Sequence, residues 1–362
     1  MYINKNKTLY STYTRTPDPE SYSEKIKDTC FVNPVFKTTK SNGYGEVKIV
    51  GDTKDCKNKC IILEEAPRSI YKEITSSKFE TTKTLTGNFC LFIGFSSYHY
   101  GHNTHDNIPI FQTLKTQLPP DTKFLIPEDN RILKEQLILI DPEWLDRLVE
   151  YPVATSIQIN GSVNFLCHAE YKLPHSFNHV RNYRADLRRA LNKHEQITKQ
   201  EHIIFCPRIN DNGNGRGNSQ SQIDEIIKTI ESVCTRSNID AKISIFKHEE
   251  YRTVSEQRRF FKDATVIIGI HGTALTNMLW ADRFSSYTQK PLQIIEGVGL
   301  TEAYKQYAHF QDTNDNGYHR LFADGFNVQW RHFFCHPKNN TFKEVDIDLE
   351  NIKNALVDSL EV

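Results

Sequence analysis

Two runs of alternating strand-like and helix-like segments constrain this chain more than any other feature of its sequence. The first run covers residues 89–169, and the second begins at residue 202 and ends with a helix that starts at Thr301. Strands that alternate with helices are typical of parallel sheets with helices on both faces. The sequence therefore predicts an α/β protein with two Rossmann-like, doubly wound domains.

The first run belongs to an N-terminal domain that we expect to span residues 1–195. Residues 1–85 mix short strand-like runs with polar turns and receive no assignment. A helix over residues 178–195, with apolar residues at helical spacing, carries the chain out of this domain. The other predicted elements are strands at 89–95, 123–126, 153–159 and 163–169 and helices at 108–118 and 142–150.

The second run predicts a C-terminal domain over residues 196–345. Ser219 and Gln222 have the spacing of a capping box, which marks the start of a helix. Residues 346–362 form an amphipathic helix that we expect to pack back on the N-terminal domain. The other predicted elements are strands at 202–206, 241–246, 265–270 and 292–295 and helices at 254–262 and 273–281.

Composition excludes several classes of protein. Lys and Arg number 45 and Asp and Glu number 45, so we expect no broad surface for nucleic acid. No apolar run is long enough to span a membrane, and the N-terminal segment has no apolar core of the kind that a signal peptide needs. We expect a cytoplasmic protein if the chain is complete, and a protein of the secretory-pathway lumen if an anchor has been removed. The eight cysteines are scattered, which predicts buried free thiols rather than a disulfide framework.

The stretch VIIGIHGTALTNMLWA, from Val266 to Ala281, carries the strongest local signal. Gly269 and Gly272 allow the backbone to turn tightly after a buried strand and to approach a ligand. The N–H groups at the start of the next helix, from Thr273 to Leu275, favour an anion such as pyrophosphate, to which His271 can donate. The alternative for an isolated His-Gly pair is a glycine turn whose histidine is satisfied by a backbone carbonyl.

The longer segment SEQRRFFKDATVIIGIHGTALTNMLWA resembles the signature of glycosyltransferase family 61, in which a short helix and a strand precede a G-x-H-G-A-x-L-T-N turn and a helix. Thr273 stands where the family usually has alanine, and Ala274 where glycine is common. Both are small, so the turn is expected to survive. Two further segments agree in order and spacing, GHNTHDNIP with His102, Asp106 and Pro109, and CPRINDNGNGRGNSQ with Arg208, Arg216 and Asn218. The resemblance covers about residues 90–310.

The resemblance implies the two-domain GT-B fold and an inverting glycosyltransferase. Such an enzyme would move a sugar from a UDP-sugar to a hydroxyl of a glycan or glycoprotein, and family members transfer xylose, arabinose or N-acetylglucosamine. The alternative is a non-catalytic nucleotide-binding or glycan-binding protein that has kept the fold. A Rossmann-type dehydrogenase is disfavoured because no G-x-G-x-x-G follows a predicted strand.

On the donor side, Arg208 follows a predicted strand and can bridge two phosphate oxygens in a fork; the alternative is a surface ion pair. Arg216 lies in a glycine-rich loop that could close over nucleotide, and Asn218 precedes the next helix. Glu296 ends a strand and can accept hydrogen bonds from ribose hydroxyls; its alternative is a helix cap. The turn from His271 to Leu275, with Gly272, would hold the diphosphate.

On the acceptor side, His102 and Asp106 supply the general base that an inverting transfer needs. Asp106 is either the base itself or the residue that orients His102, and His105 is a weaker candidate. The alternative is a helix cap at Asp106. The only Asp-x-Asp, at residues 346–348, reads as a helix N-cap. Arginines and a helix N-terminus can replace the charge of a cation, so we predict an enzyme without a metal or other cofactor.

Overall fold

The computed structural model describes residues 29–41, 44–53, 83–93, 99–167, 186–192, 200–208, 218–286, 288–299, 326–337 and 345–360. The chain divides into two compact units. The N-terminal unit spans Asp18–Leu191, and the described residues of the C-terminal unit lie within Asn192–Val362. Each contains one six-stranded sheet. The predicted helix from Thr301 falls outside the described residues.

The sheet of the N-terminal unit has the strand order β2-β1-β6-β3-β4-β5. Strand β3 is parallel to β4 and β6, and β4 is parallel to β5, as a doubly wound sheet requires. Strands β1 and β2 are antiparallel additions at one edge, built from the part of the sequence that received no assignment. The strands are β1 Thr29–Ser41, β2 Tyr44–Thr53, β3 Lys83–Ile93, β4 Lys123–Pro127, β5 Leu148–Tyr151 and β6 Ser156–Cys167.

Three predictions for this unit need correction. The strands expected at 153–159 and 163–169 form the single strand β6, which continues through Gly161 at φ 147°. A Cβ on Gly161 would lie 2.0 Å from the carbonyl oxygen of Gly87 on β3, so the two strands approach closely there. The helix expected at 142–150 is only the short α4, followed by β5.

Helices cover the side of this sheet from which Phe124 projects. Phe124 packs edge-on against Trp144 with ring centroids 4.9 Å apart, and Phe111 lies 5.8 Å from Trp144. The helix α3, whose N-cap side chain is Asn130, was not predicted. The helical elements are α1 Tyr100–His102, the π-helical turn η1 Asn103–Asn107, α2 Ile108–Gln117, α3 Arg131–Ile140 and α4 Trp144–Arg147. Residues 186–192 are also helical, and Asp186 accepts a hydrogen bond from Thr113 of α2 at 2.8 Å.

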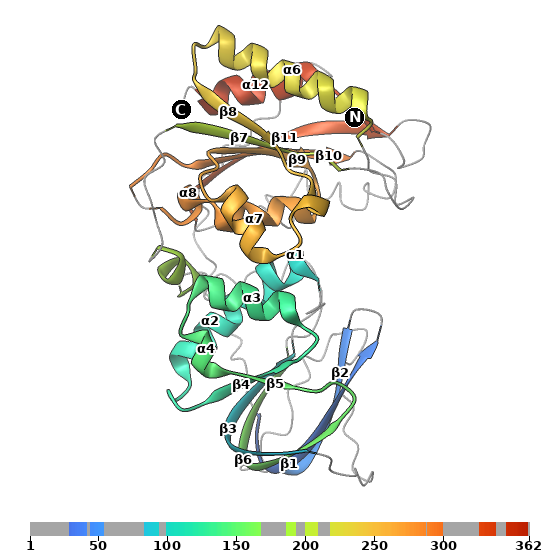
Figure 1. Cartoon of the computed structure of the whole chain (residues 1–362), viewed down its shortest axis with the longest axis vertical. Helices are drawn as coiled ribbons and strands as arrows, with labels where there is room; N and C mark the ends of the chain where they lie inside the picture. The colour runs from blue at the N-terminus through green and yellow to red at the C-terminus, as the bar shows by residue number, and fades with distance from the viewer. Residues whose placement is uncertain are drawn as a thin grey trace, which may run out of the picture. The chain divides into compact units, whose positions relative to one another are not determined.

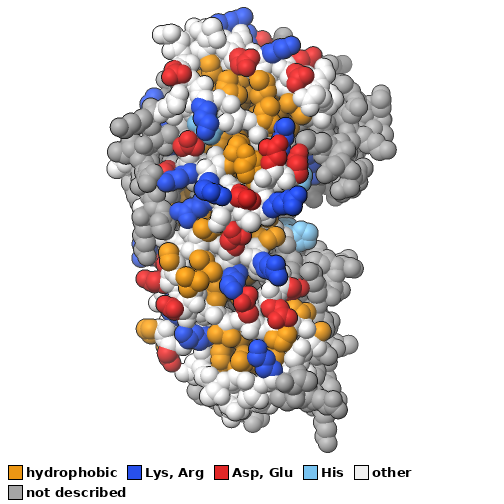
Figure 2. Space-filling view, viewed as in Figure 1, with side chains coloured by type: hydrophobic (Ala, Val, Ile, Leu, Met, Phe, Trp, Pro, Cys, Tyr) orange, Lys and Arg blue, Asp and Glu red, His pale blue; other side chains and the backbone are white. Residues whose placement is uncertain are grey.

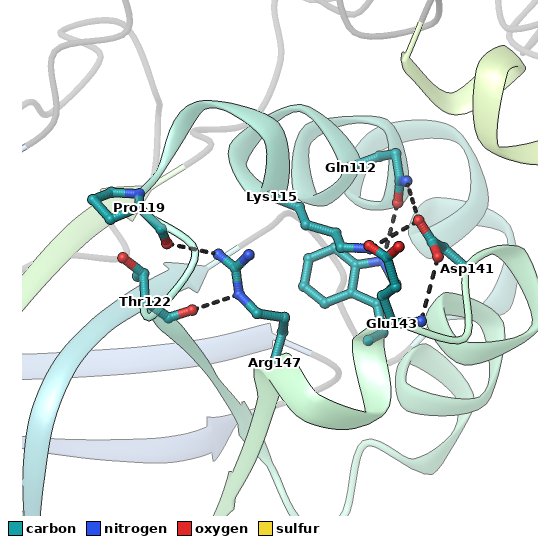
Figure 3. A network of polar contacts seen from close by, with 8 residues as sticks. Gln112, Lys115, Pro119, Thr122, Asp141, Glu143 and Arg147 are labelled. Atoms are coloured by element: carbon teal, nitrogen blue, oxygen red, sulfur yellow. Dashed lines mark hydrogen bonds and ion pairs between the residues drawn. The ribbon is translucent and has the colours of Figure 1, made fainter.

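A buried ion pair joins α2 to the start of α4 (Figure 3). Nζ of Lys115 lies 2.8 Å from Oδ2 of Asp141 and 2.7 Å from Oε2 of Glu143. Gln112 donates to Asp141 at 3.2 Å and accepts from the indole N–H of Trp144 at 3.0 Å. Burial alone would raise the pKa of Asp141, but its bonds from Lys115 and Gln112 hold that pKa below its ordinary value.

The sheet of the C-terminal unit has the order β8-β7-β9-β10-β11-β12. Its first five strands are parallel, and only β12 is antiparallel. In chain order this is the 2-1-3-4-5 arrangement of flavodoxin-like sheets, whose direction of winding reverses between β7 and β9. The strands are β7 Glu201–Cys206, β8 Ala241–Ile245, β9 Val266–Ile270, β10 Leu292–Gly299, β11 Val328–Pro337 and β12 Val345–Ile347.

Helices lie on both faces of this sheet, with α6 and α12 on one side and α7 and α8 on the other (Figure 1). Burial of Ile223, Ile226 and Ile230 of α6 in the core agrees with the predicted apolar stripe. Both halves of the Ser219–Gln222 capping box are present. The helical elements are α6 Gln220–Arg236, the 3₁₀ turn η2 His248–Glu250, α7 Val254–Phe261, the 3₁₀ helix η3 Thr273–Trp280, α8 Asp282–Ser285 and α12 Leu349–Leu360.

Two expectations for the C-terminal unit differ from the structure. The segment after β9 is the 3₁₀ helix η3 rather than an α-helix. Ile352, Ala355 and Leu356 of α12 are buried in the same core as α6, whereas we expected this helix to pack on the N-terminal domain. Its apolar face therefore completes the C-terminal core. Among the described cysteines, Cys90, Cys206, Cys234 and Cys335 are buried, as predicted, and Cys206, Cys234 and Cys335 are free thiols.

The side chain of His202 on β7 contacts β8 and the segment that follows α7. The ring is 2% exposed, with Nδ1 2.9 Å from Oδ1 of Asp263 and Nε2 2.9 Å from Oγ of Ser244. These contacts have the order of a hydrolase triad. However, a nucleophile and its base must be reachable by a substrate, and this ring is enclosed beside Phe260. Burial lowers the pKa of His202, so we interpret it as a neutral structural residue.

Candidate functional site

Three predicted donor-side residues lie in or just after neighbouring parallel strands of the C-terminal unit. Arg208 comes two residues after β7 and His271 directly follows β9. Glu296 lies within β10, which continues to Gly299, rather than at the strand end that the sequence predicted. The ladders β7–β9 and β9–β10 are parallel, so these three strands end at the same edge of the sheet. This edge includes the point where the winding direction reverses, which is where open α/β sheets bind ligands.

Arg208 links the end of β7 to the turn after β9. Its Nη1 donates to the carbonyl oxygen of His271 at 2.8 Å. A Cβ at Gly272 would lie 3.1 Å from that same Nη1, so glycine leaves the space through which the guanidinium passes. The planar fork of N–H groups on a guanidinium matches the geometry of a bidentate acceptor. The structure thus places Arg208 against the His-Gly turn.

Asn218 closes the base of the loop that starts after Arg208. The backbone N–H of Asn218 donates to the carbonyl oxygen of Arg208 at 2.7 Å, and its Oδ1 accepts from the Arg208 N–H at 3.1 Å. Asn218 is 6% exposed, and its Nδ2 has no hydrogen-bond partner among the described residues. An amide N–H left without a partner at a buried position is costly, which makes Asn218 a candidate donor to a ligand. Arg216 lies outside the described residues.

The turn from His271 to Leu275 begins the helix η3. The N–H of His271 donates to the carbonyl oxygen of Gly297 on β10 at 2.8 Å, which fixes the turn to the sheet. The N–H of Leu275 donates to the carbonyl oxygen of Gly272 at 3.1 Å. Thr273 is exposed and Ala274 is half-buried. The N–H groups of these two residues stand at the helix start, where a helix favours an anion.

Glu296 holds the histidine ring of the turn. Oε1 of Glu296 lies 2.6 Å from Nδ1 of His271. A carboxylate only accepts hydrogen bonds, so Nδ1 carries the proton in this contact. The side chain of Glu296 is 2% exposed, whereas that of His271 is 31% exposed. A ligand can therefore reach the ring but is kept from the carboxylate.

Two residues of β11 complete the surroundings of Glu296, and sequence reasoning missed both. Nε1 of Trp330 donates to Oε2 of Glu296 at 3.0 Å, and Nε2 of His332 lies 3.3 Å from the same oxygen. The alternation of Trp330 and His332 in VQWRHFF places them on one face of a strand. That pattern was the available signal, but it becomes informative only when β11 is paired with β10.

The predicted acceptor-side residues lie on a helical irregularity of the N-terminal unit. Asp106 and His105 fall within the π-helical turn η1, which separates α1 from α2, and their side chains are outside the described part. His102 ends α1, and its ring meets that of His99 edge-on with centroids 6.1 Å apart. Single π-helical turns within α-helices often occur at functional sites.

The π-helical turn is supported by buried amide and hydroxyl groups. Gln136 of α3 donates to the hydroxyl of Thr104 at 2.9 Å, and Thr104 donates to the carbonyl oxygen of Tyr100 at 2.9 Å. Asn107 donates to Oδ1 of Asn103 at 3.0 Å. All four polar side chains that make these contacts are fully buried. These buried polar contacts therefore stabilise the backbone that carries His102 and Asp106.

In the ranges that the structure describes, no group of three or more His, Cys, Asp or Glu is placed to hold a metal ion. Within the same ranges, no helix is both long and apolar enough to cross a bilayer. The face of the molecule in Figure 2 intersperses acidic and basic side chains, in line with the balanced composition.

Comparisons with known proteins point to one family. No curated protein matches the chain. An oxidoreductase from Corynebacterium diphtheriae is 7% identical at a TM-score of 0.30, covering 45% of this chain and 96% of that one. A flavo di-iron protein variant from Thermotoga maritima is 11% identical at a TM-score of 0.26, covering 63% of this chain and 47% of that one. Likenesses at these scores carry no argument.

The family model described as Glycosyltransferase 61 matches residues 100–287. The matched region runs from the first residue of α1, through the π-helical turn and β7, to just beyond α8. It contains the segments with His102, Arg208 and His271 and covers more than half of the 362 residues. The chain belongs to glycosyltransferase family 61.

Proposed function

We propose that this protein is an inverting, metal-independent glycosyltransferase that moves a sugar from a UDP-sugar to a hydroxyl of a glycan or glycoprotein. The observation that carries the proposal is the contact of Arg208 with the turn of His271 at the reversal point of a flavodoxin-like sheet. The xylose, arabinose and N-acetylglucosamine donors of the family are the first to test. The GT-B arrangement of the two units is part of the same proposal.

The donor diphosphate would be held by the C-terminal unit. Arg208 offers a guanidinium, His271 a ring N–H, and Thr273 and Ala274 the N–H groups of a helix start. Negative charge develops on the diphosphate as the bond to the sugar breaks, so donors fixed in advance stabilise the transition state more than the ground state. These groups supply the positive charge that a divalent cation supplies in other transferases.

The acceptor hydroxyl would lose its proton to a base on the π-helical turn. Asp106 is the proposed base; in the alternative, Asp106 orients His102, which takes the proton in its place. The hydroxyl oxygen then attacks the anomeric carbon from the side opposite the leaving UDP, which inverts the configuration. A general base of this kind contributes roughly 100-fold to 10,000-fold in rate.

Turnover distinguishes this proposal from the non-catalytic alternative. UDP-xylose, UDP-arabinose and UDP-N-acetylglucosamine are incubated with oligosaccharide and glycopeptide acceptors in EDTA, and released UDP and the glycosylated product are measured together. The proposal expects both to appear in equal amounts and to disappear in Asp106→Asn. Binding of UDP with no transfer to any acceptor, from any of these donors, would favour the binding-protein alternative.

A further inference from the structure

The carboxylate of Glu296 is the most completely enclosed charge at the proposed donor site. The residue is 1% exposed, at the point where β10 lies between β9 and β11. Its neighbour across β9 is Gly269, and its neighbour across β11 is His332. A buried carboxylate is costly unless hydrogen-bond donors or positive charge surround it. Its partners therefore decide what it does.

Three side-chain nitrogens converge on the two oxygens of Glu296. Nδ1 of His271 approaches Oε1 at 2.6 Å, which is a short N–H···O hydrogen bond to a carboxylate. Nε1 of Trp330 at 3.0 Å and Nε2 of His332 at 3.3 Å approach Oε2. Ribose hydroxyls would have to displace these contacts at a side chain with almost no exposed surface. The geometry disfavours the ribose role that the sequence suggested.

The arrangement matches that of a carboxylate that orients a histidine. A partner at one ring nitrogen fixes the protonation and direction of the other. With Nδ1 bonded to Glu296, the ring turns Nε2 away from the carboxylate. A proton on Nε2 of a ring held in this way can be donated to an anion. His271 is the exposed member of the pair, at 31% against 2%.

We propose that Glu296, fixed by Trp330 and His332, is a positioning residue that directs Nε2 of His271 to the diphosphate and makes no contact with the ribose. This inference rests on the proposed function, because it assigns the anion at His271 as the diphosphate of a nucleotide donor. Trp330 and His332 of β11 then affect diphosphate binding indirectly, because they fix Glu296 and Glu296 in turn fixes His271.

Glu296→Gln tests the assignment with two ligands, UDP and inorganic pyrophosphate, measured by calorimetric titration or competition in EDTA. Glutamine keeps the volume but removes the negative charge. We expect the affinities for UDP and pyrophosphate to fall by the same factor, at least about tenfold, as loss of a charge-assisted hydrogen bond implies. Glu231→Gln on the exposed side of α6 makes the same chemical change away from the site and should leave both affinities unchanged.

Trp330→Phe provides a second test if Glu296→Gln does not fold. Phenylalanine retains an aromatic ring but removes the N–H that reaches Oε2. We expect a smaller fall in affinity than in Glu296→Gln, again by the same factor for UDP and pyrophosphate. A fall for UDP alone in either variant would return Glu296 to a nucleoside contact and overturn the proposal. Wild-type UDP binding that pyrophosphate cannot compete for would also overturn it.

Failure of the wider function gives a different result. If the wild-type protein binds neither UDP nor pyrophosphate, the donor site itself is wrong. If the wild type binds both and Glu296→Gln binds both equally well, only the positioning role is wrong, and the donor site stands.

Discussion

The two regions that carry the predicted site residues are organised in different ways. In the C-terminal unit, residues from β7, β9, β10 and β11 meet at one sheet edge through direct hydrogen bonds, such as those of Arg208 and Glu296. In the N-terminal unit, His102 and Asp106 lie on a helix interrupted by a π-helical turn. Sheet topology assembles the first region, whereas a local helix irregularity positions the second. Binding and chemistry should therefore respond to different substitutions.

Asp106→Asn should have the largest effect and should separate the two regions most clearly. We expect kcat to fall by roughly 100-fold to 10,000-fold, because the base is lost. Affinity for UDP should not change, since the donor contacts lie in the other unit. Steady-state kinetics and UDP titration on the same preparation measure both quantities. Equal losses in kcat and in UDP affinity would show that the division of roles is wrong.

Lys115→Met should destabilise the N-terminal unit by about 3 kcal/mol, because it leaves the buried carboxylate of Asp141 without its ion-pair partner. Urea unfolding monitored by circular dichroism measures the change. The double variant with Asp141→Asn should recover part of the loss. If the single variant unfolds like the wild type, the network in Figure 3 does not hold the helices on this sheet.

The same network predicts acid sensitivity. The folded pKa of Asp141 lies below its ordinary value, so its contribution to stability is complete above the unfolded pKa of about 3.9 and is lost as pH falls through the folded value. Stability measured between pH 5 and pH 2 should therefore fall less steeply in Asp141→Asn than in the wild type. If stability falls with pH equally steeply in both proteins, Asp141 is not the cause of the acid sensitivity.

Arg208→Lys should weaken UDP binding by about tenfold, because lysine keeps the charge but loses the planar fork. Melting temperature should change little, since the contact to the His271 carbonyl lies at a partly exposed turn. Gly272→Ala is a matched perturbation that places a Cβ 3.1 Å from Nη1 while retaining the arginine, and we expect a weaker effect in the same direction. Unchanged binding in both variants would remove Arg208 from the donor site.

Substitution of His202 should have the smallest effect, and that effect should appear only in the pH dependence of stability. Burial lowers its folded pKa, so the unfolded chain takes up the proton first as the solution is acidified. Stability of the C-terminal unit should fall below the unfolded value of about pH 6.5. Denaturant midpoints at pH 7.5 and 5.5 should differ less in His202→Gln than in the wild type. If His202 instead made the wild type more stable at pH 5.5 than at pH 7.5, relative to His202→Gln, the residue would be charged in the folded protein.

The sequence predicted the C-terminal elements well because each has a clear local signal. The Ser219–Gln222 capping box and the β-rich run before Gly269 predicted α6 and β9 close to their actual bounds. Alternation of strands and helices also correctly indicated a parallel sheet, in which β7 and β9, the strands that precede Arg208 and His271, are neighbours.

Other features depend on interactions between segments that periodicity does not encode. The contacts of Trp330 and His332 with Glu296 exist only because β11 pairs with β10. Trp330 lies 34 residues after Glu296 in the sequence. The π-helical turn at Asp106 reflects backbone hydrogen bonding that side-chain spacing does not reveal. The two strands predicted at 153–159 and 163–169 form one strand because Gly161, which lies between them, allows a close approach to Gly87.

Binding of UDP in the presence of EDTA tests the central claim most directly. Ligand at about 100 times its dissociation constant adds roughly 2.7 kcal/mol to the stability of the unit that binds it, which should raise the thermal midpoint by several degrees. The account predicts this rise with EDTA as with manganese, and its loss in His271→Ala. No rise with UDP, or a rise only with manganese, would contradict a diphosphate site made by Arg208 and His271 without a metal.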